Sequence, residues 1–169
     1  ARWLAAATDA ISYEQTMFSD DAQNWADLRS EPAQFQVNWA HGAPGIGLAR
    51  LGGLAVLDTE TIRQEIAIAL ATTQRQMVWG VDSLCWGNFG RIETLLVAAQ
   101  TLNCPNLLAT AHQATAVVLA NARMHGTFTL SADGCGVMNP GFFHGLSGIG
   151  YQILRLADPS KIPSVLLWQ

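Results

Sequence analysis

Apolar residues recur every three or four positions along most of the chain, which is typical of helices that bury one face. Asp58 precedes one such stripe and Asn106 another, and we expect each to cap its helix. Gly126 is expected to end a helix, and residues 126–130 are the best candidate for a strand. The pattern therefore predicts an all-α fold, with helices near 3–14, 62–70, 92–102, 107–122 and 149–156.

Three glycine-containing turns of the form x-G-x-x-G each lead into a predicted helix. Their first glycines are separated by 45 and 58 residues, which leaves room for one helical hairpin each time. Such a spacing is typical of an array of helical hairpins, and if the array closes into a ring the helix starts converge on one rim. The first glycine of each turn can allow a positive φ or a close approach of the backbone, and the second can allow tight packing of the helix start. Alternatively, all of these glycines serve only the packing between helices. The paired glycines are Gly42 and Gly45, Gly87 and Gly90, and Gly145 and Gly148.

Composition narrows the class of protein. The chain has 169 residues, half of them hydrophobic, with 13% charged residues and a net charge of −4. This excludes a disordered chain and gives no basic footprint for nucleic acid. No apolar run reaches the ~18 residues of a membrane span. Three cysteines are too few for a disulfide framework, so we expect a cytoplasmic protein; Cys135, between two glycines, is expected in a loop.

Four segments together resemble the C-terminal, LanC-like cyclase domain of class II (LanM-type) lanthipeptide synthetases. Residues 24–29 (NWADLR) resemble its N-W-P-D-L-R segment, and 39–46 (WAHGAPGI) its W-C-H-G-A-P-G-I turn. Residues 84–88 (LCWGN) resemble its second glycine turn, and 140–151 (PGFFHGLSGIGY) its third. The resemblance runs over nearly the whole chain, so 1–169 is interpreted as the C-terminal part of such a domain.

The resemblance implies an α/α toroid of about seven helical hairpins, of which this chain supplies roughly the last three. It also implies an upstream dehydratase region in the same polypeptide. The family reaction is a Michael addition in a precursor peptide. A cysteine thiol attacks a dehydroalanine or dehydrobutyrine and forms a lanthionine or methyllanthionine ring.

The resemblance further implies zinc, which deprotonates the peptide thiol and leaves a fourth position open beside three protein ligands. The first ligand position is Ala40 here, the second is Cys85 and the third is Trp86. Neither a methyl group nor an indole binds zinc, so one family ligand survives. An alternative set is Cys85 with His41 and His144, which directly precede the first glycines of their turns and would give a Cys–His₂ site. The acid/base histidine of the family lies upstream, so no catalytic residue is assigned.

Two functions therefore stay open from the sequence. The chain is either part of a zinc-dependent lanthionine-forming cyclase, or an inactive pseudo-cyclase that binds the peptide or completes the toroid. In both cases Trp39, Trp86 and Asn88 are candidates for binding the peptide. A glycosidase with a similar toroid would need paired carboxylates at the ring centre, and the glycine turns carry none.

Overall fold

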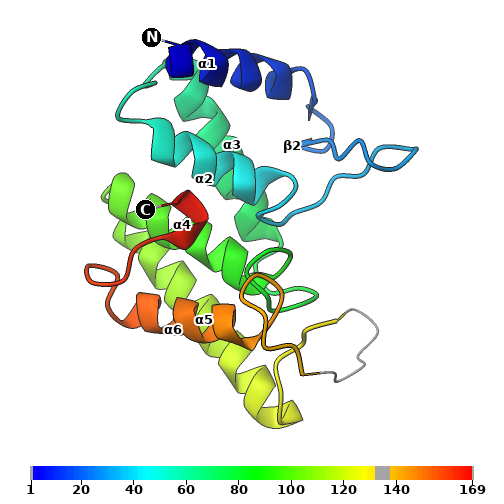
Figure 1. Cartoon of the computed structure of the whole chain (residues 1–169), viewed down its shortest axis with the longest axis vertical. Helices are drawn as coiled ribbons and strands as arrows, with labels where there is room; N and C mark the ends of the chain where they lie inside the picture. The colour runs from blue at the N-terminus through cyan, green and yellow to red at the C-terminus, as the bar shows by residue number, and fades with distance from the viewer. Residues whose placement is uncertain (1, 132–137, 169) are drawn as a thin grey trace.

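The fold is built from helices, as predicted. The computed structural model describes residues 2–131 and 138–168, so Cys135 lies outside the described residues. Figure 1 shows the elements in chain order. They are α1 (Arg2–Gln15), β1 (Phe18–Ser19), β2 (Asn24–Trp25), α2 (Ala43–Gly53), α3 (Glu60–Arg75), α4 (Asn88–Thr101), α5 (Pro105–His125), α6 (Leu146–Ala157) and the 3-10 turn η1 (Val165–Leu167).

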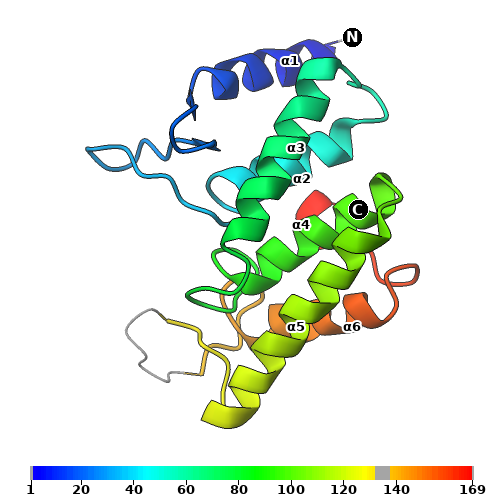
Figure 2. The same ribbon diagram turned by 180° about the vertical axis from the view of Figure 1, so that it is seen from behind.

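The helices form a row of antiparallel hairpins. Helix α3 packs along α2, and α5 along α4, while α4 also contacts α2 on one side and α6 on the other. Figures 1 and 2 show α3 and α5 on the opposite side of the row from α2 and α6. Helix α4 is the centre of the core because all but its last two residues are buried. The hairpin array is thus confirmed, while closure into a toroid stays a prediction.

Two predicted helix caps are wrong. Helix α3 is capped by Thr59, whose hydroxyl accepts a hydrogen bond from the backbone N–H of Ile62 at 3.2 Å. Asp58 lies one residue too early and binds Arg63 instead, at 2.6 Å. Helix α5 begins at Pro105, with Cys104 at the N-cap position, so Asn106 lies inside the helix and does not cap it. Proline suits the first helical turn, where its missing N–H needs no partner. Gly126 does end α5, with a left-handed φ of 75°.

The strand predicted at 126–130 does not form. Thr129 instead exchanges hydrogen bonds with Asp82, donating its N–H to the Asp82 carboxylate at 2.8 Å and accepting from the Asp82 N–H at 2.7 Å. Phe128 packs edge-on against Phe89 of the core. The apolar alternation therefore reflects a loop anchored on the core, while the short strands β1 and β2 lie at 18–19 and 24–25.

Helix α1 lies at one end of the row and has no buried residue. Its last turn is held by polar contacts. The Glu14 carboxylate pairs with Arg50 at 2.8 Å, and Gln15 donates to Glu65 at 2.6 Å. No described helix has both the length and the apolar character needed to cross a membrane.

Candidate functional site

The three glycine turns share one backbone geometry. In each, the first glycine is the N-cap of its helix and lies against the carbonyl oxygen of the residue six positions earlier. Only Gly42 has a positive φ, 90°, so close approach is the property common to the three. A Cβ would lie 1.9 Å from the Gln36 oxygen at Gly42, 2.4 Å from Val81 at Gly87 and 2.1 Å from Asn139 at Gly145.

The second glycine of each turn repeats the same contact one helical turn later. Its near neighbour is the carbonyl oxygen of its own preceding loop rather than a separate helix. A Cβ would lie 2.0 Å from the Trp39 oxygen at Gly45, 2.1 Å from Leu84 at Gly90 and 1.9 Å from Phe142 at Gly148. Any side chain would clash there, because a carbon atom cannot approach a carbonyl oxygen so closely. The paired glycines therefore bring each loop down onto the start of its own helix.

The three loops are also hydrogen-bonded to one another at equivalent positions. Ala40, Cys85 and Phe143 each stand two residues before the first glycine of their turn. The Ala40 N–H donates to the Cys85 carbonyl at 3.2 Å, and the Cys85 N–H donates to the Phe143 carbonyl at 2.9 Å. The rim predicted from the glycine spacing therefore exists, with the three turns side by side.

The ligand positions on this rim do not fit a zinc centre. Cys85 is buried, and burial raises the pKa of its thiol. Ala40 beside it has no donor atom, and Trp86 is half exposed, with its ring edge-on to His144 at 4.8 Å. Within residues 2–131 and 138–168, no three His, Cys, Asp or Glu side chains form a group that could hold a metal ion.

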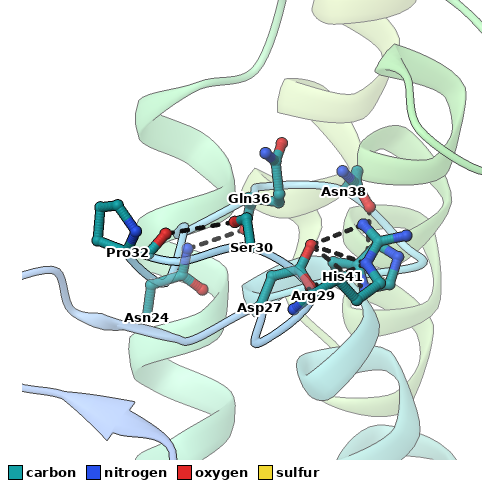
Figure 3. Close-up of polar contacts among 8 residues, drawn as sticks. All are labelled: Asn24, Asp27, Arg29, Ser30, Pro32, Gln36, Asn38 and His41. Atoms are coloured by element: carbon teal, nitrogen blue, oxygen red, sulfur yellow. Dashed lines mark hydrogen bonds and ion pairs between the residues drawn. The ribbon is translucent and has the colours of Figure 1, made fainter.

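The first turn is held by residues of the preceding loop (Figure 3). Asp27 is nearly buried and accepts hydrogen bonds from Arg29, whose guanidinium holds the pKa of that carboxyl well below its usual range. The Asp27–Arg29 pair is therefore a structural contact within this loop. The Nδ1 atom of His41 lies 3.9 Å from the same carboxylate. The backbone N–H of His41 donates a hydrogen bond to Asn38 Oδ1 at 2.8 Å.

Asn24 has a role that the sequence did not reveal. Its Oδ1 accepts from the Ala43 N–H at 2.8 Å and its Nδ2 donates to the Gln36 carbonyl at 2.9 Å. Gly42 has no side chain with which to cap α2, so Asn24 supplies the missing acceptor from the β2 strand. The sequence features that could have indicated this role are the glycine at the N-cap of α2 and the asparagine of the NWADLR segment.

Asn88 directly follows the first glycine of the second turn and is buried. Its Oδ1 accepts from the Trp79 N–H at 2.9 Å and from Arg91, and its Nδ2 donates to Asp82 at 2.7 Å. These bonds engage the amide oxygen and one amide N–H of Asn88 with partners inside the protein.

A comparison with protein families decides what this repeated geometry represents. The family model described as "Lanthionine synthetase C-like protein" matches residues 2–167. The chain belongs to the lanthionine synthetase C-like family. Membership supports a lanthionine cyclase-like function at the level of the family, which acts on peptides. A comparison with curated proteins gives no match.

The rim of this LanC-like chain carries exposed tryptophans between two cavities. Trp79 and Trp86 are 69% and 52% exposed and line both. One cavity, of about 840 Å³, continues to Leu130 and His144. The other, of about 780 Å³, continues to Arg75 and Arg91. Trp39 is half-buried, stacks on Phe143 at 5.7 Å and lines a separate cavity of about 460 Å³.

Proposed function

We propose that this chain is the C-terminal portion of the cyclase domain of a class II lanthipeptide synthetase, joined to an upstream dehydratase region. We further propose that it binds the precursor peptide at its glycine-turn rim without assembling a zinc centre from its own residues. The four motifs of the family, in the family's order, support the first part of the proposal.

One observation carries the second part. The backbones of Ala40 and Cys85 are hydrogen-bonded to each other, so the first two ligand positions of the family are neighbours and offer one sulfur between them. A catalytic zinc site needs three protein ligands and an open fourth position. We infer that the described residues do not by themselves lower the pKa of a peptide thiol from its ordinary value of ~8.5.

The replacement of the third ligand by Trp86 supports a binding role. The indole is half exposed beside His144 and forms a wall of both rim cavities. Large aromatic side chains provide apolar contact area for peptides at little entropic cost, because they have few rotatable bonds. We infer that an exposed aromatic surface replaces the metal at this position.

The proposal is tested with a synthetic peptide that contains one dehydroalanine and one cysteine. Protein and peptide are incubated with and without zinc, and the free thiol is counted by alkylation and mass spectrometry. We expect the thiol count to match the protein-free control, because no thiolate is generated on the protein. Zinc-dependent loss of the free thiol would contradict the proposal and favour an active cyclase.

Binding of the same peptide is measured separately by calorimetry. We expect Trp86→Ala to weaken it roughly tenfold, since a buried aromatic contact is worth about 1–3 kcal/mol. Trp3→Ala is the matched control, because Trp3 is 81% exposed on α1 and lines neither rim cavity. Equal binding by both variants would show that the rim does not hold the peptide.

A further inference from the structure

Arg91 is a buried cation whose hydrogen-bond acceptors are all neutral. It is 2% exposed, at the start of the central helix α4. Its guanidinium donates to the carbonyls of Val37, at 2.7 Å, and Trp79, and to Asn88 Oδ1 at 2.6 Å. Its Nε–H has no acceptor among the described residues. Burial lowers the pKa of Arg91 to about 10, as expected of a charge removed from water without an ion-pair partner.

The carboxylate that acts on Arg91 through space is already engaged elsewhere. Asp82 uses one oxygen to accept from Asn88 Nδ2 at 2.7 Å and the other to accept from the Thr129 N–H at 2.8 Å. Asp82 thus stabilises the neighbouring loop and pairs with Arg91 only at a distance. A buried charge without an adjacent counter-ion raises the free energy of the folded protein, and an anion close to Arg91 would offset part of that increase.

Arg91 lines the cavity of about 780 Å³ described above, together with Arg75 at the end of α3. The rest of the wall consists mainly of four amide side chains and the aromatic rings of Phe35, Trp79 and Trp86. Of the described residues that line it, none is an aspartate or a glutamate. The charge of this cavity is therefore opposite in sign to the net charge of the chain, which is −4.

Arg75 is the cation that a ligand can reach. It is exposed, and one of its terminal nitrogens, Nη2, donates to Thr72 Oγ1 at 2.7 Å. A guanidinium has five N–H donors in a planar fork that matches a carboxylate. A carboxylate bound there would lie in the cavity that Arg91 also lines and would be attracted by its positive charge.

We propose that this cavity binds an acidic side chain of the precursor peptide, whose carboxylate pairs with Arg75 in the field of Arg91 while flanking residues contact Trp79 and Trp86. This inference rests on the proposed peptide-binding function and adds the charge of the segment that is recognised.

The test compares two capped tetrapeptides, acetyl-Leu-Glu-Glu-Leu-amide and acetyl-Leu-Gln-Gln-Leu-amide, by calorimetry at low salt. We expect the glutamate peptide to bind the wild-type protein about tenfold more tightly, and added salt to reduce the difference. Arg75→Gln should abolish the preference and Arg75→Lys should retain most of it. Arg63→Gln is the control, because Arg63 is an exposed arginine paired with Asp58 outside the cavity.

Each outcome has a separate meaning. Equal binding of the two peptides would overturn the acidic specificity and leave peptide binding intact, whereas binding of neither would also remove the proposed function. The wild-type comparison stands even if an Arg75 variant fails to fold. N-acetyl-glutamate amide is added as a third probe, and binding as tight as that of the glutamate peptide would overturn the assignment to a peptide segment.

Discussion

The backbone N–H of Ala40 donates to the carbonyl oxygen of Cys85 at 3.2 Å, although the two residues are 45 positions apart. This bond places the first two ligand positions of the cyclase family next to each other on the rim. We infer that these two backbone positions are retained, with one buried thiol between them.

Restoring the two missing sulfurs should restore metal binding. We expect the double variant Ala40→Cys/Trp86→Cys to bind about one equivalent of zinc, because three thiolates would then lie on adjacent backbone segments. Elemental analysis of the purified protein measures this directly. Ala40→Ser/Trp86→Ser is the matched control, since serine has a similar size without a thiolate. Zinc in the serine variant, or none in the cysteine variant, would show that the surrounding scaffold does not support the site.

Two glycines of helix α6 should respond oppositely to alanine. At Gly148 a Cβ would lie 1.9 Å from the Phe142 carbonyl oxygen and 2.8 Å from Leu84 Cδ1. Gly148→Ala should therefore lower the free energy of unfolding by at least about 2 kcal/mol. At Gly150 nothing lies within 4 Å, so Gly150→Ala should raise it by roughly 0.5–1 kcal/mol. Chemical denaturation measures both, and equal effects would contradict the close approach of the third loop.

The buried pair between Glu93 and Arg155 should contribute strongly to stability. The two groups join α4 to α6 at 2.8 Å, and Gln152 donates to the same carboxylate. Arg155→Met would leave the Glu93 charge buried without its cation, at a cost of about 3–5 kcal/mol. The control is Arg63→Met, which breaks an exposed pair worth less than about 1 kcal/mol. Similar losses in thermal unfolding would mean that the α4–α6 contact does not depend on this pair.

Cys85 should be a slow target for alkylation at neutral pH. Burial raises the pKa of its thiol, and only the thiolate reacts, so the reactive fraction at pH 7 is lower than for an ordinary cysteine. Its rate should increase as the pH rises above ~8.5, where an ordinary thiol already ionises. Iodoacetamide labelling followed by peptide mass spectrometry compares it with Cys104, which is less buried. In denaturant the two should react alike; equal rates in the native protein at pH 7 would contradict the burial of Cys85.

Helix positions could be predicted because their cause is local. The stripe over 92–102 corresponds to α4 and that over 107–122 to α5, since an amphipathic helix records its buried face in its own spacing. Caps were less predictable, because Asp58 and Thr59 are both good cap residues and the choice depends on where the first helical turn begins. The strand predicted at 126–130 was wrong because alternating apolar residues also occur in a loop that packs on the core. This loop hydrogen-bonds to Asp82 and not to another strand.

Some features of the candidate site could likewise be predicted from the sequence, and others could not. The three glycine turns, the retained Cys85 and the losses at Ala40 and Trp86 can all be read along the chain. The Asn24 cap of α2, which bridges 19 positions, and the neutral surroundings of Arg91 cannot, because each depends on segments that meet only in the folded chain.

The helical class, the paired glycines and the family to which the chain belongs could be inferred from the sequence alone. These follow from residue type and spacing within one helix or one turn. The folded structure was needed to show that the three turns are hydrogen-bonded side by side and that the Asn88 amide has partners inside the protein. It also showed that Arg91 is buried beside a cavity lined with amide and aromatic side chains. Burial and charge environment depend on distant segments brought together by packing, and these properties determine what the rim can bind.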